Sequence, residues 1–301
     1  MTGLGALIKR NIKLYFSDKG MFFSSLITPV ILLVLYGTFL KNVYDDSFRS
    51  ALEAAGVSVS DKLINGCVGG QLVSSLLAVS CVTVAFCSNL LMIKDKTTGA
   101  KRDLTITPVK PGTLALGYYF STIFSTLIIS LTATGVCFGY LAVVGWYLSV
   151  GDVFALLLDV LLLTLFGTAL SSCVNFFLST DGQASAVGTL ISAGYGFICG
   201  AYMPISSFTE GLRKVISLLP GTYGTSLLRN HAMQGVFDEM SSLGFPTEAV
   251  EAIRDGVDCN IYFFGNKVEQ SEMYLVLIAS VAVLIGLYIV MNVVAGRKKR
   301  R

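Results

Sequence analysis

Residues 66–93 read GCVGGQLVSSLLAVSCVTVAFCSNLLMI, and neither this stretch nor residues 112–151 contains a single Asp, Glu, Lys or Arg. About 20 apolar residues in an α-helix are enough to cross the hydrocarbon core of a bilayer, which is about 30 Å thick. Backbone groups within lipid must find their hydrogen bonds inside the protein, and a helix provides them. The two stretches therefore predict an all-α protein that crosses a membrane more than once.

The composition of the whole chain supports this prediction. Hydrophobic residues make up 53% of the 301 residues and charged residues only 14%, whereas soluble domains carry roughly 25% charged residues. We predict a single transmembrane domain over residues 1–301. Its six spans are expected at residues 22–40, 67–92, 113–139, 153–177, 185–203 and 273–295. Trp146 and Tyr147 separate the third span from the fourth, because both residue types favour the membrane–water interface.

Six spans would bring both termini to one face, and the charges indicate which face it is. That face carries 14 of the 22 Lys and Arg residues but only four of the 19 Asp and Glu residues. Lys and Arg concentrate on the cytoplasmic side of membrane proteins, so we expect both termini in the cytoplasm and the chain in the plasma (inner) membrane. The basic residues 297–301 are read as an anchor to lipid headgroups. No nucleic-acid partner is expected.

A basic amphipathic helix is expected at residues 4–19. Leu4 and Leu7 lie on one face of this helix, and Lys9 and Lys13 lie on another. Such a helix binds in the plane of the membrane interface, here leading into the first span. The alternative is that these residues simply extend the first span into the cytoplasm.

Residues 204–272 are expected to form an outer loop between the fifth and sixth spans. Ser207 and Glu210 have the spacing of a capping box, and apolar residues follow at helical spacing as far as Pro220. This pattern predicts an outer amphipathic helix. A second short helix is expected near residues 247–255, without an assigned role.

The residues needed for catalysis are scarce. His231, the only histidine, is expected outside the membrane, and no metal-binding or protease motif is present. Asp159, the one charge inside a span, could contact a substrate or ion, or could serve only a polar neighbour or the outer interface. The seven cysteines lack metal-site spacing and are expected to be free thiols, although a bond from Cys259 to Cys67 or Cys199 stays open. We predict that the chain is not an enzyme and holds no metal or cofactor.

Small residues recur every four positions in two of the predicted spans. They are Gly66, Gly70, Ser74 and Ala78 in the second span and Ala184, Gly188, Ser192, Gly196 and Gly200 in the fifth. Residues four apart share one helical face, and small side chains allow helices to approach closely in lipid. These faces are expected to pack within the subunit, against a second copy, or along a transport pathway.

The loop at residues 94–112 is too short for a domain and too charged for a simple turn. A short helix is expected at residues 98–106, ended by the restriction that Pro108 imposes on the residue before it. Its chemistry suits the docking of a cytosolic partner. The residues expected to take part are Asp95, Thr98, Gly99, Lys101, Arg102, Asp103, Leu104, Thr107 and Pro108.

At this loop the chain resembles the membrane subunit of type-2 ATP-binding-cassette (ABC) transporters. Matching features are Thr98-Gly99, Leu104 and Thr107-Pro108 in the loop, Pro29 in the first span, Gly200 to Pro204 after the fifth, and then Pro220 and Leu228-Arg229. The loop departs from the family pattern twice, because Thr97 stands where a second acid is common and Ala100 where a second Thr is common. The order and spacing of these features extend over nearly the whole chain.

The resemblance implies the permease subunit of an ATP-driven exporter. Two such subunits, identical or paralogous, would pair around a pathway for a lipid-like, drug-like, peptide or glycan substrate. Two cytosolic ABC ATPases would bind ATP and Mg and contact the 94–108 loop, with the 178–184 loop as a weaker second contact. The alternatives are an ion-coupled secondary transporter or channel, for which we find no internal repeat, and a membrane scaffold that transports nothing.

Overall fold

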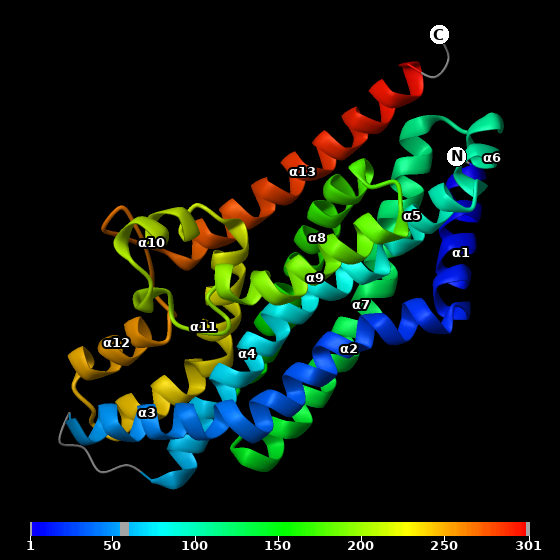
Figure 1. Ribbon diagram of the computed structural model, residues 1–301. Helices are drawn as coiled ribbons and strands as arrows, with labels where there is room; N and C mark the ends of the chain where they lie inside the picture. The colour runs from blue at the N-terminus through cyan, green and yellow to red at the C-terminus, as the bar shows by residue number, and fades with distance from the viewer. Residues whose placement is uncertain (1, 55–59, 299–301) are drawn as a thin grey trace.

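The computed structural model describes residues 2–54 and 60–298, and these residues are almost entirely helical (Figure 1). The helices are α1 (Thr2–Ser17), α2 (Lys19–Leu35), the π-turn η1 (Tyr36–Leu40), α3 (Lys41–Ala54), α4 (Asp61–Ser88), α5 (Leu90–Thr97), α6 (Ala100–Ile106), α7 (Pro111–Val144), α8 (Val150–Phe177), α9 (Asp181–Ile198), the 3₁₀ turn η2 (Ile205–Ser207), α10 (Glu210–Ile216), α11 (Pro220–Ser242), α12 (Thr247–Gly256) and α13 (Gln270–Lys298). The strands β1 (Ile261–Phe263) and β2 (Asn266–Val268) form one antiparallel hairpin. The prediction of an all-α membrane protein is confirmed.

Five helical stretches of the described chain are long and apolar enough to cross a membrane: Lys19–Ser50, Asp61–Thr97, Pro111–Val144, Val150–Phe177 and Gln270–Gly296. They contain the first, second, third, fourth and sixth predicted spans. The fifth predicted span corresponds to α9, which has 18 residues and a length of about 27 Å. Because α9 is shorter and less apolar than the other five, the total of six spans stays a prediction.

The long helices form one bundle (Figure 1). The two described termini lie at one end of this bundle, and the short helices α5 and α6 lie at that same end. At the opposite end lie α3 and α12. The first span was expected to end at residue 40. The helix that contains it continues instead from α2 through η1 into α3. Residues 145–149 connect α7 to α8, as predicted from Trp146 and Tyr147, and a capping box of Ser149 and Asp152 begins α8.

Helix α4 is the most buried of the long helices. It packs against α2, α7, α8, α9 and α11. Its small residues explain the close approach, because a Cβ atom on Gly66 would lie 2.6 Å from the Tyr147 ring, and one on Gly70 would lie 2.7 Å from Met233 Cγ. Ser74 and Ala78 are both fully buried. The small-residue face of the second span therefore packs within the subunit.

The outer loop predicted at 204–272 contains a buried helix instead. Most of α11 is buried, and it packs between α4, α8 and α13. The sequence of α11 is polar because it contains Thr, Ser, Arg and Asn residues. These side chains form hydrogen bonds with buried partners; for example, the Asn230 amide and the Ser226 hydroxyl both donate to the carbonyl of Cys259. The sequence shows the polarity of α11 but not these partners.

The capping box predicted at Ser207 and Glu210 is wrong. Ser207 ends the 3₁₀ turn η2, and Thr209 precedes the short helix α10 without a side-chain cap. The helix itself is present, and α12 covers the second helix predicted near 247–255. At the start of the chain, α1 has one buried face that contains Leu7 and Tyr15. Leu7 packs against residues of α7, and Tyr15 packs against residues of α4 and α7.

Candidate functional site

The loop expected to dock a partner forms two short helices, α5 and α6, at the end of the bundle that holds the termini (Figure 1). They are separated by Thr98 and Gly99. Gly99 has a φ of +84°, in the left-handed region that glycine adopts without steric cost. The helix predicted at 98–106 therefore begins at Ala100, two residues late.

Asp95 faces the interior and ties α5 to two other helices. Its carboxylate is 4% exposed and accepts hydrogen bonds from Arg10 of α1 at 2.6 and 3.0 Å and from the Tyr118 hydroxyl of α7 at 2.6 Å. The hydrogen bond with Asp95 raises the pKa of the Arg10 guanidinium. Charge-assisted hydrogen bonds are stronger than neutral ones, so a force on α5 acts on α1 and α7 as well.

Two lysines of α5 extend these contacts. Lys96 donates to the carbonyls of Asn175 and Phe176 at 2.8 and 2.7 Å, and so caps the C-terminal end of α8. Lys94 forms an ion pair with Asp18, whose carboxylate also caps α2. The hydrogen bond from Lys94 lowers the pKa of Asp18. Helix α5 is thus joined to the first helices of the chain and to α7 and α8.

The remaining residues expected in the docking loop lie at or near the surface. None of the residues of α6 is buried. Exposed positions are Thr98, Arg102, Asp103, Thr107 and Pro108, and half-buried ones are Gly99, Lys101 and Leu104. Leu104 leans on the cluster that contains Leu7 of α1. Residues 178–180, part of the weaker predicted contact, join α8 to α9.

A groove of about 780 Å³ runs between α2 and α9. Its walls are apolar, with Ile27 and Ile31 on one side and Phe197 on the other. Neutral polar side chains interrupt them: Ser24, Thr28, Asn175, Ser185, Thr189 and Ser192. None of the described lining residues is Asp, Glu, Lys or Arg.

The small residues of α9 divide between this groove and the subunit interior. Gly188 and Ser192 line the groove together with Ala184, and a Cβ atom on Gly188 would meet no atom within 4 Å. At Gly196 a Cβ would overlap the Tyr202 ring, and at Gly200, with φ +75°, it would lie 2.8 Å from Ile205. The first three residues of the series therefore face the groove, whereas Gly196 and Gly200 pack tightly at the turn after α9.

Asp159 lies in a buried cluster rather than in the groove. Its carboxylate is fully buried, and it bonds to His231 Nδ1 at 2.6 Å and accepts from the Tyr274 hydroxyl at 2.7 Å. His231 lies on α11, which packs against α8, and its location outside the membrane stays a prediction. Of the two readings of Asp159, this geometry matches the polar-partner one.

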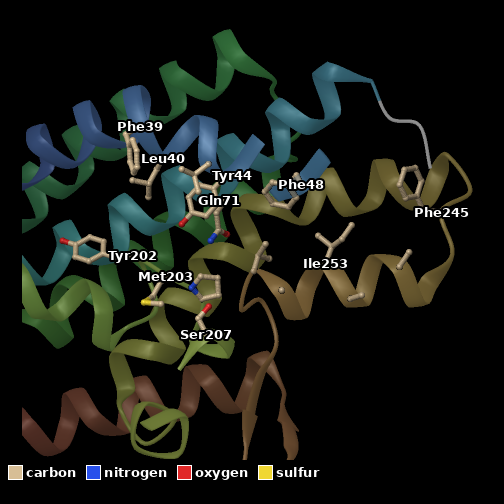
Figure 2. A pocket seen from close by; sticks show the side chains of 16 residues that line it. Phe39, Leu40, Tyr44, Phe48, Gln71, Tyr202, Met203, Ser207, Phe245 and Ile253 are labelled. Carbon is tan, nitrogen blue, oxygen red and sulfur yellow. The ribbon is translucent and has the colours of Figure 1, made fainter. Parts of the chain in front are cut away.

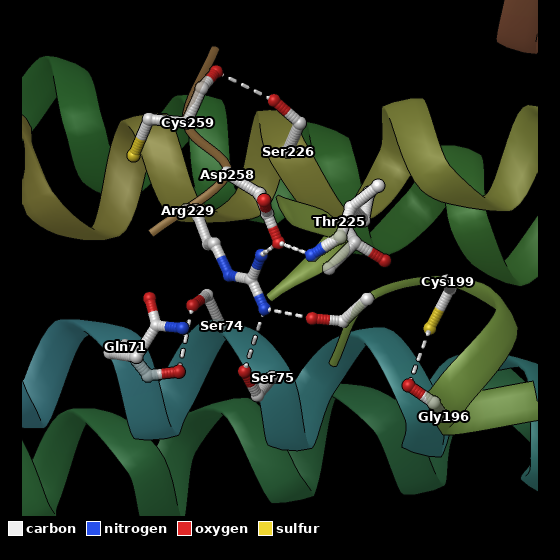
Figure 3. A network of polar contacts seen from close by, with 12 residues as sticks. Gln71, Ser74, Ser75, Gly196, Cys199, Thr225, Ser226, Arg229, Asp258 and Cys259 are labelled. Carbon is white, nitrogen blue, oxygen red and sulfur yellow. Dashed lines mark hydrogen bonds and ion pairs between the residues drawn. The ribbon is translucent and has the colours of Figure 1, made fainter. Parts of the chain in front are cut away.

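A second buried network surrounds Arg229, shown in Figure 3. The guanidinium is 1% exposed; it pairs with Asp258 at 3.1 Å and donates to Ser75 of α4 at 3.3 Å and to the Gly200 carbonyl. Asp258 also accepts from the backbone N–H of Ile205 at 2.8 Å. Arg229 thus joins α11, α4, the turn after α9 and the segment after α12. The sequence marked Arg229 only through the family resemblance.

A comparison against known families agrees with the architecture. The ABC-2 type transporter family matches residues 2–232. This chain is an ABC-2 type transporter protein. The match confirms the resemblance read from the sequence and makes the chain a transport subunit, a multi-pass permease of an ABC transporter.

The ABC-2 match extends from α1 into α11, so it includes the α5–α6 helices, the groove and Arg229. It ends before α12, the hairpin and α13. A comparison with curated proteins gave no match. The cysteines of this ABC-2 protein are unpaired throughout the described structure, and six of the seven are buried.

Proposed function

We propose that two copies of this permease, or one copy and a paralogue, pair with two cytosolic ABC ATPases and export an amphipathic substrate. The ATPases would bind ATP and Mg, and this chain would bind neither. The proposal extends the family membership to a direction, a substrate class and a set of partners. It also assigns the chain to the plasma (inner) membrane with both termini in the cytoplasm.

The observation that carries the proposal is the construction of α5 and α6. No residue of α6 is buried, so the helix is accessible to a partner. Helix α5, in contrast, is bonded through Asp95 to α1 and α7 and through Lys96 to α8. A partner that pushes on α6 would therefore move three helices of the bundle together. An element of this kind suits the transmission of ATPase closure to the membrane helices.

The charges favour the proposed orientation. Lys101, Arg102 and Lys110 lie at the α5–α6 end of the bundle, together with the basic residues of α1. Lys and Arg concentrate on the cytoplasmic side. The end that would meet the ATPases is thus the end that the positive-inside rule assigns to the cytoplasm.

The groove between α2 and α9 supports the transport pathway and the substrate class. Exposed apolar residues line it, among them Ile27, 53% exposed, on α2 and Phe197, 48% exposed, on α9. A second subunit facing this groove would close it into a channel. Apolar walls with scattered hydroxyl groups suit a lipid-like, drug-like or glycolipid molecule. None of its described lining residues is Asp, Glu, Lys, Arg or His, which disfavours ion coupling through it.

The test is co-purification of the permease with its cognate ABC ATPase, followed by measurement of ATP hydrolysis in lipid nanodiscs. Arg102→Glu reverses a charge on the exposed face of α6 and is expected to weaken both complex formation and stimulated hydrolysis. Gly99→Pro is expected to do the same, because proline cannot adopt the φ of +84° found there.

Arg213→Glu is the matched control, since Arg213 is also exposed on a short helix but lies on α10, outside the α5–α6 end. It should leave the complex intact. The proposal would be refuted if Arg102→Glu and Arg213→Glu behaved alike, or if the folded chain bound no ABC ATPase and transported solute with an ion gradient alone.

A further inference from the structure

A pocket of about 680 Å³ lies at the end of the bundle opposite α5 and α6, between α3 and α12 (Figure 2). One wall contains Phe39 and Leu40 from η1 and Tyr44 and Phe48 from α3. Helix α12 forms the facing wall. Ligand pockets in proteins have volumes of about 300–1,000 Å³ and mostly apolar linings, and this pocket fits both criteria.

The apolar lining is interrupted by Gln71, by Ser207 and by the hydroxyl groups of Tyr44 and Tyr202, and of these residues Gln71 is the most deeply buried. Gln71 of α4 is 1% exposed and projects into the pocket between Tyr44 and Met203 (Figure 2). Its side chain contacts the Tyr44 hydroxyl, but its amide oxygen Oε1 has no hydrogen-bond partner in the described structure. A buried acceptor without a partner costs free energy, and a bound donor would remove that cost.

The pocket carries no charge to attract an ion. None of its described lining residues is Asp, Glu, Lys or Arg. Burial of an uncompensated charge is strongly unfavourable, so a charged ligand would be excluded. The aromatic rings of Phe39, Phe48 and Phe245 offer faces for flat or aliphatic groups.

Much of the pocket wall formed by α12 and the residues before it lies outside the part of the chain that matches the family. Phe245, Ala249, Ala252 and Ile253 all follow residue 232, where the family match ends. Leu40 and Tyr202 line both the pocket and the α2–α9 groove, so the two cavities share a boundary. The pocket is therefore a feature that this chain's own α12 adds beside the proposed pathway.

We propose that this pocket binds an uncharged, largely apolar small molecule that donates one hydrogen bond to Gln71. Hydroxyl and secondary amide groups meet this requirement. The aromatic and aliphatic walls hold the apolar body, and Gln71 orients its polar end. The site gives the segment after α11 a role, as the wall that selects this ligand, and its occupancy requires no ATPase.

The test is photolabelling of the full chain in lipid nanodiscs with 4-hydroxybenzophenone, kept slightly acidic so that the phenol is neutral. Labelled peptides are mapped by mass spectrometry. We expect saturable labelling of peptides that contain residues 39–48 and 245–257. In Gln71→Leu the half-saturating concentration should rise about 3- to 10-fold, the contribution of one hydrogen bond. 4-Methoxybenzophenone, which lacks the donor, should show no such difference between wild type and Gln71→Leu.

Ala252→Phe tests the site by filling it. Ala252 is exposed on α12 and lines the pocket, so a ring there blocks the cavity without disturbing the core, and labelling should be lost with both probes. Glu248→Phe places the same ring on an exposed position of the same helix outside the lining and should label like wild type. Labelling that does not saturate, or that Ala252→Phe leaves unchanged, would overturn the proposal. Because no ATPase is present, this result is independent of the proposed export function.

Discussion

Replacing Arg229 by Met is expected to be among the most destabilising single changes in the chain. The side chains of Arg229 and Asp258 are 1% and 6% exposed, and Arg229→Met removes the hydrogen bonds to Asp258, Ser75 and Gly200 together (Figure 3). Asp258 then keeps backbone N–H groups of the Ile205–Ser206 turn but no cation to balance its charge. Removal of one member of a buried ion pair costs about 3–5 kcal/mol, because the other charge is left without a partner.

The double variant Arg229→Met/Asp258→Asn separates the charge from the packing. Asn removes the buried charge, can still accept from Ile205, and tolerates the φ of +55° at position 258. Its total cost should be about 1–3 kcal/mol, the penalty for unsatisfied polar groups alone. The second substitution is therefore expected to restore about 2 kcal/mol of the free energy of unfolding.

The native cysteines provide the assay. Cys199 and Cys259 lie beside the network and are each 1% exposed, so a fluorogenic thiol reagent reports their exposure during titration with a denaturing detergent. Wild type, Arg229→Met, Asp258→Asn and the double variant form a double-mutant cycle. Its coupling free energy measures the interaction between Arg229 and Asp258. Equal stability of wild type and Arg229→Met, or no recovery in the double variant, would refute the reasoning.

The same variants carry a pH signature. Burial raises the pKa of the Asp258 carboxyl, and Arg229 opposes that rise. Without Arg229 the folded-state pKa rises further above its unfolded value, so folded protein takes up a proton more readily. The deficit of Arg229→Met is therefore largest at neutral pH and shrinks as the pH falls through the raised pKa. Arg229→Met/Asp258→Asn has lost this carboxyl and should not show that trend.

Three further changes test the other sites. Gly70→Val should destabilise the chain by about 1–3 kcal/mol through overpacking, since its Cβ would lie 2.7 Å from a neighbouring side chain, whereas Gly188→Val has open space and should leave the detergent midpoint unchanged. Arg10→Met leaves the buried Asp95 with the Tyr118 hydroxyl alone and should reduce ATPase stimulation while complex formation persists; loss of binding instead would assign Arg10 to docking. Asp159→Leu removes the partner of the half-buried His231 ring and Tyr274 hydroxyl and should cost about 1–3 kcal/mol with transport retained in the folded fraction. Abolished transport at wild-type stability would favour ion coupling through Asp159.

Hydropathy alone determined the class of the protein and the five long apolar helical stretches of the bundle. Charge-free runs of this length have no stable alternative in lipid, because each backbone polar group must be paired within its own helix. The boundary at Trp146 and Tyr147 and the close packing of α4 at Gly70 also depend on local properties, namely the interfacial preference of aromatic rings and the absence of a Cβ atom. Such local causes are readable along the chain.

Tertiary structure decided where the polar residues went. Helix α11 has the polar composition of a surface segment, but its Ser226, Arg229 and Asn230 have buried partners at Asp258 and Cys259. His231 is half-buried against α8, where Asp159 is its partner. Asp95 likewise turned inward because Arg10 and Tyr118, 85 and 23 positions away, converge on it. Polarity indicates that a side chain needs a partner, but the partner comes from a distant part of the chain, and only the packed bundle shows whether that partner is protein or water.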